Sequence, residues 1–163
     1  MHPIIEGAMR VFGDNIDTDQ ICPGRYLELT DPAAIAAHCL EGADPQFQSR
    51  FRTGDIVAAG TNFGCGSSRE HAAIALKALG VGAVLAKSFA RIFYRNGINM
   101  GLPLIVCPAL DDIAREGEAL RLDLARNIAL NVATGREAAI EPISDYAMRI
   151  LDAGGIKALM RNA

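Results

Sequence analysis

The chain has 163 residues, half of them hydrophobic, with 16 Lys and Arg residues against 19 Asp and Glu residues. This length suits one hydrophobic core, so residues 1–163 are expected to form a single domain. The slightly negative charge without a basic cluster argues against a nucleic-acid partner, and no apolar stretch reaches the roughly 20 residues that span a bilayer. The N-terminus also lacks the basic and apolar regions of a secretion signal, so a cytoplasmic location is expected.

The first third of the chain alternates apolar runs with polar or glycine-containing breaks. A strand is predicted over residues 4–12 and a polar loop over 13–23. Asp31-Pro32 is typical of a helix start, which predicts a helix up to Leu40. Residues 47–51 remain ambiguous, and a buried strand is predicted over 55–60.

A glycine-rich segment follows that strand, and residues 62–72 are Asn-Phe-Gly-Cys-Gly-Ser-Ser-Arg-Glu-His-Ala. Ser67 and Glu70 have the spacing of a capping box, which predicts a helix that begins near Ser67 and covers 68–79. The first amides of a helix lack internal partners and carry a partial positive charge. Together with Arg69 and two serine hydroxyls, they predict a site for a carboxylate or phosphate. The alternative is a glycine loop that only opens a helix, as in many α/β proteins.

The rest of the chain continues the alternation, with a final helix capped by Ser144. The predicted strands cover 83–87, 102–107, 120–124, 128–132 and 138–143, and the predicted helices cover 89–95 (ended by Asn96-Gly97), 110–116 and the segment from Ser144 to Leu151. This alternation predicts an α/β fold that is layered or barrel-like.

The other polar side chains carry weaker signals. Asp14, Asp17 and Asp19 are closely spaced, but Gln20 stands where a calcium loop requires glycine, so a role in organising the loop is favoured. His71 is expected to be neutral, hydrogen-bonded and structural, because a charged histidine is disfavoured in the first turn of a helix.

Two arginines and four cysteines remain. Arg91 and Arg95 are open as substrate cations, interface residues or surface charges. No metal site is expected from the cysteine spacings, and Cys65 is expected to be a small packing residue. The remaining cysteines are Cys22, Cys39 and Cys107, of which the last two are expected to be buried.

Three motifs occur together and in order: Asp14-Asn-Ile-Asp-Thr-Asp-Gln-Ile21, Gly66-Ser-Ser-Arg-Glu-His-Ala72 and Lys87-Ser-Phe-Ala-Arg-Ile-Phe93. They resemble the swivel domain of the aconitase superfamily. Over nearly the whole chain, spacing and length look like the separate small subunits of 3-isopropylmalate dehydratase and homoaconitase. The resemblance implies a swivelling β/β/α-type domain. It also implies a hydro-lyase that isomerises 2-isopropylmalate and 3-isopropylmalate by dehydration and rehydration in leucine biosynthesis.

The resemblance also implies roles for individual residues. Ser67 is implied as the base that removes a proton next to a carboxylate, and Ser68 and Arg69 as the residues that hold the substrate carboxylate. A [4Fe–4S] cluster and the other acid–base groups are implied on a separate large subunit, in a heterodimer or heterotetramer, with none bound by this chain alone. The substrate is then a small hydroxy-dicarboxylate.

Substrate choice is implied to depend on the loop formed by Tyr26, Leu27, Glu28 and Leu29. Homoaconitase-like members carry arginine at the third position, where it pairs with a distal carboxylate. Glu28 repels such a group, which favours isopropylmalate. Homoaconitase and a methylmalate or dimethylmalate dehydratase remain alternatives. Two other classes stay open: a non-catalytic anion-binding module, and a hydrolase with Ser67 as nucleophile, which is disfavoured because Gly-Cys-Gly-Ser-Ser is not the Gly-x-Ser-x-Gly elbow.

Overall fold

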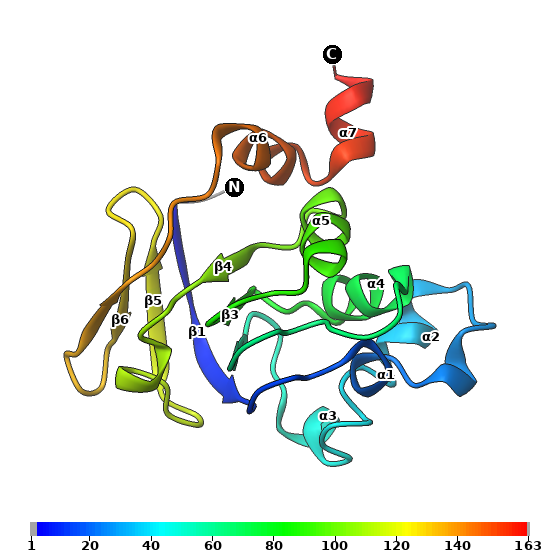
Figure 1. Ribbon diagram of the computed structural model, residues 1–163, viewed down its shortest axis with the longest axis horizontal. Coiled ribbons are helices and arrows are strands. Elements are labelled where there is room, and N and C mark those ends of the chain that lie inside the picture. The colour runs from blue at the N-terminus through cyan, green and yellow to red at the C-terminus, as the bar shows by residue number, and fades with distance from the viewer. Residues whose placement is uncertain (1–2, 163) are drawn as a thin grey trace.

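The computed structural model describes residues 3–162. Met1 and His2, which belong to the segment assessed for a secretion signal, and Ala163 lie outside the described residues. Seven strands form one sheet in the order β4-β3-β2-β1-β5-β6-β7 (Figure 1). Their bounds are β1 Ile4–Val11, β2 Ile56–Ala59, β3 Ala83–Ala86, β4 Leu104–Val106, β5 Ala119–Asp123, β6 Ile128–Asn131 and β7 Glu137–Ala139.

Strand β1 joins a parallel half of the sheet to an antiparallel half. Its last residues, 9–11, pair with β2 in parallel, with Met9 opposite Ile56. Its first residues, 4–8, pair with β5 in antiparallel fashion, with Ile4 opposite Asp123. The sheet curls at this junction, so that β5 and β6 stand away from the parallel strands (Figure 1). The predicted α/β, barrel-like fold is confirmed.

The α-helices gather on one side of the parallel strands, where α4 and α5 connect β2 to β3 and β3 to β4 (Figure 1). No helix within residues 3–162 is long and apolar enough to cross a membrane. The helical bounds are α1 Thr18–Ile21, η1 Gly24–Tyr26, α2 Pro32–Ala36, α3 Phe47–Arg50, α4 Glu70–Leu79, α5 Arg91–Asn99, η2 Leu110–Asp112, α6 Asp145–Ala153 and α7 Ile156–Arg161.

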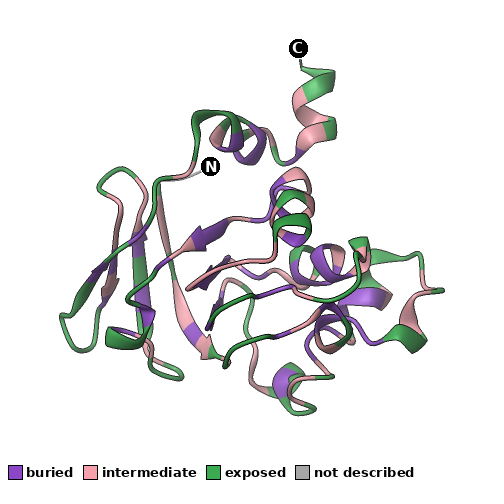
Figure 2. Cartoon of the chain, in the orientation of Figure 1, coloured by how far each residue is buried: buried purple, intermediate pink, exposed green. Residues whose placement is uncertain are grey.

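Two apolar clusters lie on opposite faces of the parallel strands. Successive side chains of a strand point to opposite faces, and β2 shows this directly. Val57 and Ala59 belong to the cluster beneath the helices, whereas Ile56 and Ala58 belong to the cluster inside the curl. Both faces are therefore covered, which explains why this strand is an unbroken apolar run. Figure 2 shows the buried residues concentrated in these strands and the adjoining helix faces.

Most predicted strands, and the predicted helix that Ser144 caps, are confirmed within a few residues. The Ser144 hydroxyl accepts a hydrogen bond from the Ala147 amide at 3.2 Å and caps α6. Asn127 and Gly135 lie in the connections between β5, β6 and β7, with left-handed φ values of 56° and 75°.

Three predictions in the N-terminal half are wrong. The loop 13–23 contains α1, because Asp17 and Gln20 form a capping box there. The helix predicted from Asp31-Pro32 to Leu40 ends at Ala36, and the residues from there to Leu40 form turns. The helix predicted to begin near Ser67 begins at Glu70, and Arg69 occupies its N-cap position without a side-chain hydrogen bond to the helix backbone. Tertiary contacts described below hold Ser67 in the preceding loop, so Glu70 does not complete a capping box.

Two later helices also differ from the prediction. Helix α5 begins at Arg91 and passes through Gly97 to Asn99, so Asn96-Gly97 does not end it. A Cβ atom on Gly97 would lie 2.5 Å from Leu104 Cδ1, so this glycine allows the helix to approach β4 closely. The helix predicted over 110–116 is only the short turn η2.

Candidate functional site

The candidate site lies at the carboxyl ends of the parallel strands β2 and β3, which is where open α/β sheets usually bind ligands. The loops that leave these strands are joined by backbone hydrogen bonds. The Phe63 amide donates to the Ser88 carbonyl at 3.0 Å, and the Ala90 amide donates to the Phe63 carbonyl at 3.0 Å. The glycine-rich segment and the segment from Lys87 to Phe93 therefore form one continuous surface.

A third segment, residues 14–18, supports the glycine-rich segment through hydrogen bonds. The Thr18 amide donates to the Cys65 carbonyl at 2.8 Å, and the Thr18 hydroxyl donates to the Ser67 carbonyl at 2.8 Å. Asp14 accepts a hydrogen bond from the Thr61 amide, and Asp17 caps α1. The predicted loop-organising role is confirmed for both aspartates.

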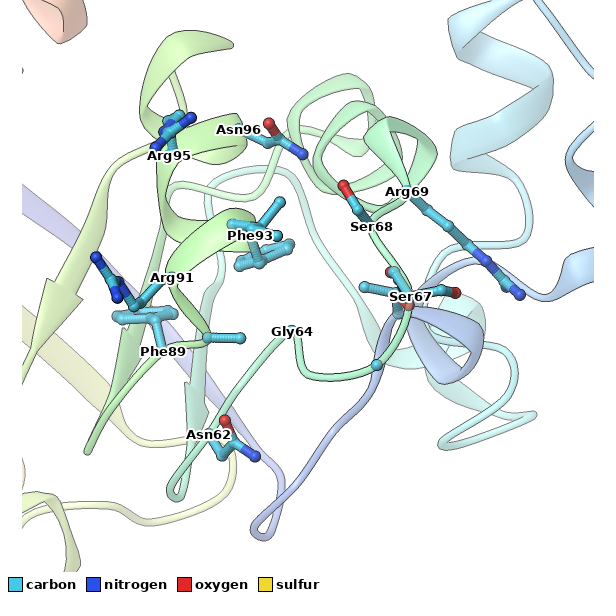
Figure 3. Close-up of a pocket in the computed structure, with 14 residues that line it drawn as sticks. Asn62, Gly64, Ser67, Ser68, Arg69, Phe89, Arg91, Phe93, Arg95 and Asn96 are labelled. Carbon is cyan, nitrogen blue, oxygen red and sulfur yellow. Dashed lines mark hydrogen bonds between the residues drawn. The ribbon is translucent and has the colours of Figure 1, made fainter.

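Gly64 permits close packing between the loop and α5. Its φ is +85°, a conformation that residues with a Cβ rarely adopt. A Cβ atom there would also lie 2.2 Å from Cγ of Phe93. Figure 3 shows Gly64 facing the ring of Phe93, so the glycine sets the distance between the two walls of the site.

A cavity of about 540 Å³ opens between the glycine-rich loop and α5 (Figure 3). Ser67 and Ser68 both line it and are exposed, and neither hydroxyl forms a hydrogen bond with a residue of the described chain. Two hydroxyls are therefore free to contact a ligand. The full lining consists of Thr18, Asn62, Gly64, Gly66, Ser67, Ser68, Arg69, Phe89, Ala90, Arg91, Ile92, Phe93, Arg95 and Asn96.

Arg69 borders the cavity, but its side chain is directed away from α5 (Figure 3). Its Nη1 lies 2.9 Å from Asp19 Oδ1 and 3.3 Å from the Cys22 carbonyl oxygen. The hydrogen bond from Arg69, followed by one from the Gly24 amide, lowers the pKa of Asp19 below its ordinary value. The structure therefore assigns Asp19 a partner that the sequence did not indicate.

Arg91 and Arg95 line the opposite wall, one turn apart on α5. Both are exposed, and neither forms an ion pair within the part of the chain that the structure describes. They place uncompensated positive charge at the rim of the cavity. Sequence reasoning left their role open and missed Thr18, Asn62, Phe93 and Asn96 as lining residues. The signal for these four was the topology, because the ends of adjacent parallel strands meet at one edge.

The segment Tyr26–Leu29 lies beside α4 and is not among the residues that line this cavity. Glu28 is exposed, whereas the other three are partly buried. His71 Nε2 donates to the Leu29 carbonyl oxygen at 2.9 Å, so the prediction of a hydrogen-bonded structural histidine is confirmed. The role of the segment in substrate choice stays a prediction.

The cysteines are all free, and Cys39 and Cys107 are buried as predicted. Across residues 3–162, no three His, Cys, Asp or Glu side chains are grouped so as to hold a metal ion. The donors of this chain therefore do not fit an iron–sulfur cluster, which requires several thiolates at one point.

Comparisons with known proteins agree with this geometry. Residues 41–109 match the family model of the aconitase C-terminal domain. The chain is 54% identical to the 3-isopropylmalate dehydratase small subunit 1 of Methanopyrus kandleri, over 99% of this chain and 95% of that protein. It is also 54% identical to the 3-isopropylmalate dehydratase small subunit of Nautilia profundicola, over 94% of this chain and 92% of that protein. A crystal structure of 3-isopropylmalate dehydratase from Methanocaldococcus jannaschii matches with a TM-score of 0.93 at 43% identity, covering 98% of this chain and 94% of that one.

Proposed function

The chain belongs to the 3-isopropylmalate dehydratase small subunits of the aconitase superfamily, and from this premise we propose how its cavity serves the reaction. The reaction interconverts 2-isopropylmalate and 3-isopropylmalate in leucine biosynthesis, by removal and return of water. The observation that carries the proposal is the pair of exposed hydroxyls of Ser67 and Ser68, unpartnered among the described residues, in a cavity bordered by arginines.

Ser67 is proposed as the base that takes the proton from the carbon next to a substrate carboxylate. A serine hydroxyl is a weak base in water, so its alkoxide needs a preorganised positive environment. The first amides of α4 and the guanidinium groups of Arg91 and Arg95, which form no ion pair among the described residues, support such an environment. The Thr18 hydrogen bond to the Ser67 carbonyl holds the backbone in place.

Ser68 and Arg69 are proposed to hold a substrate carboxylate. The pairing with Asp19 uses Nη1 of Arg69 and leaves Nε and Nη2 without partners among the described residues. A guanidinium carries five donors in a rigid fork, so it can bind Asp19 and a carboxylate at once. Asp19 would then orient the arginine.

The remaining chemistry is proposed to come from a larger partner subunit. That subunit is expected to carry a [4Fe–4S] cluster, which would supply the Lewis acid that departure of hydroxide requires. The heterodimeric or heterotetrameric assembly and a cytoplasmic location remain predictions. Isopropylmalate is favoured over homocitrate as substrate because Glu28 replaces the arginine expected in homoaconitase-like loops.

The test is Ser67→Ala in the complex reconstituted with the large subunit. Turnover of isopropylmalate should be lost, while the melting temperature and subunit binding stay unchanged. Ser49→Ala is a matched control, because Ser49 lies on α3, outside the cavity. Turnover near the wild-type rate in Ser67→Ala would rule out Ser67 as the base. Iron and sulfide analysis of this chain alone after anaerobic reconstitution should find no stoichiometric cluster.

A further inference from the structure

Four side chains form a polar cluster at the start of the segment Tyr26–Leu29, two of them on the short turn η1 and two on the turns that follow α2. We call Arg25, Tyr26, His38 and Glu41 the Glu41 clamp, because three of them contact that carboxylate. Glu41 Oε2 lies 2.7 Å from His38 Nδ1, and Glu41 Oε1 lies 3.1 Å from Arg25 Nη2 and 3.4 Å from the Tyr26 hydroxyl. The hydrogen bond from His38 is the main cause that lowers the pKa of Glu41.

The rings of the clamp are also stacked. The Tyr26 and His38 rings are 3.6 Å apart at their centroids and 8° from parallel. The guanidinium carbon of Arg25 lies over the Tyr26 ring, 4.7 Å from its centroid. Tyr26 is thus held through its ring and through its hydroxyl, which fixes the residue that opens the segment.

The clamp is attached to the loop that supports the cavity. On either side of Glu41, the Leu40 amide donates to the Ile21 carbonyl at 2.8 Å, and the Gly42 amide donates to the Gln20 carbonyl at 3.1 Å. Leu40 is fully buried with a φ of +59°, a strained conformation that persists only where its surroundings determine it. Glu41 therefore has a fixed position relative to α1, which in turn holds Ser67 through Thr18.

The two ends of the segment have further anchors. The Gly24 amide donates to Asp19 Oδ1 at 2.9 Å, and the Leu29 carbonyl accepts from His71 Nε2. Between these anchors the only regular structure is the short turn η1. The clamp and these anchors, not a strand or long helix, thus determine where Leu27 and Glu28 lie.

We propose that His38 and Glu41 are positioning residues for substrate selection, which hold Tyr26 so that residues 27–29 meet the variable group of the substrate in one conformation. This proposal rests on the proposed function. A rigid apolar wall distinguishes two alkyl groups that differ by one methylene by roughly 10- to 200-fold, whereas a mobile wall adapts to the larger and to the smaller group. Loss of the clamp should therefore reduce selectivity more than it reduces turnover.

The experiment compares kcat/KM for isopropylmalate and methylmalate in the reconstituted complex. His38→Ala should reduce the ratio of the two values by about 2- to 12-fold, the range expected for a lost aromatic stack, mainly through KM for isopropylmalate. Glu41→Gln, the conservative variant, should retain most of the wild-type ratio, because the amide oxygen still accepts from Arg25 and Tyr26. Glu137→Ala is the control and should change neither value, because Glu137 is exposed at the start of β7. An unchanged ratio in His38→Ala, or an equal loss for both substrates, overturns the proposal.

A second measurement does not depend on catalysis. Trypsin cleavage after Arg25 should be about 2- to 12-fold faster in His38→Ala than in the wild type. Cleavage after Arg136, which is exposed in the turn between β6 and β7, should be unchanged. Equal acceleration at both sites indicates general destabilisation and contradicts the proposal. Faster cleavage only after Arg25, in a complex without isopropylmalate turnover, would instead place the failure in the proposed function.

Discussion

The hydroxyl of Thr18 donates a hydrogen bond to the carbonyl oxygen of Ser67 across 49 residues of sequence. Thr18 is only 3% exposed, so its hydroxyl is held at a fixed place in the fold. It connects α1 to the residue proposed as the base and explains why Ser67 does not begin α4.

Thr18→Val should therefore lower the free energy of unfolding by about 0.5–1.5 kcal/mol, the net contribution of a typical hydrogen bond, because it removes the donor to the Ser67 carbonyl. The kcat of the reconstituted complex should fall by more than this loss of folded protein explains. Thr18→Ser keeps the hydroxyl and should retain most of the activity. Chemical denaturation and steady-state kinetics give both values, and equal activity of the Val and Ser variants would contradict a positioning role.

Gly64→Ala should destabilise the protein by roughly 2 kcal/mol or more. The left-handed φ disfavours alanine, and the new Cβ would overlap the ring of Phe93, so two costs add. Gly13→Ala is the control, because a Cβ there meets nothing within 4 Å. Thermal unfolding of the two variants measures the difference, and similar melting temperatures would show that the loop relaxes without cost.

The ion pair between Asp19 and Arg69 predicts a pH-dependent contribution to stability. The folded-state pKa of Asp19 is lowered, so the pair stabilises the folded protein above the ordinary aspartate value of 3.8 and loses this effect as the pH falls through the lower folded value. Wild type should thus be slightly more stable than Asp19→Asn at neutral pH, with convergence in acid. Denaturation curves from pH 7 to pH 3 measure this, and a difference that grows in acid would contradict it.

Cys65 should be the first cysteine to react with an alkylating reagent at pH 8. It is partly exposed, whereas Cys22, Cys39 and Cys107 are buried. Burial raises the pKa of all three, in the case of Cys107 to about 11, so they stay protonated at that pH. Peptide mass spectrometry should locate the first label on Cys65, and Cys65→Ser should remove it. Early labelling of Cys39 would indicate that the helical side of the core opens.

Glu28→Arg should shift activity from alkylmalates toward homocitrate, if residue 28 faces the variable group in the assembled enzyme. Arginine offers a bidentate partner for a distal carboxylate that glutamate repels. The measurement is the ratio of kcat/KM for isopropylmalate and homocitrate in both forms. An unchanged ratio would mean that residue 28 points away from the substrate.

Local patterns predicted the parts of the fold that depend on neighbouring residues. Apolar runs located the parallel strands, and Ser144 capped α6 as its spacing indicates. The same logic failed at Ser67, because contacts from Thr18 override the capping-box spacing. The orientation of Arg69 was likewise beyond local reasoning, since its partner Asp19 lies 50 residues away.

The pairing of the strands in the sheet was the larger feature that the sequence did not predict. Nothing in residues 4–11 indicates that β1 pairs with β2 at one end and with β5 at the other, because each strand pattern specifies a face and not a partner. The cavity followed from that topology, which brings the ends of β2 and β3 together with α5. Its lining beyond the serine motif was therefore not accessible from one sequence.

The divided pairing of β1 has a consequence for synthesis on the ribosome. The strand emerges first, and its last residues meet β2 as soon as residues 56–58 have left the exit tunnel. Strand β5, which pairs with residues 4–8, follows only at residues 119–123. Unpaired strand edges attract other chains, so this N-terminal edge is where a nascent or truncated chain is most prone to associate wrongly.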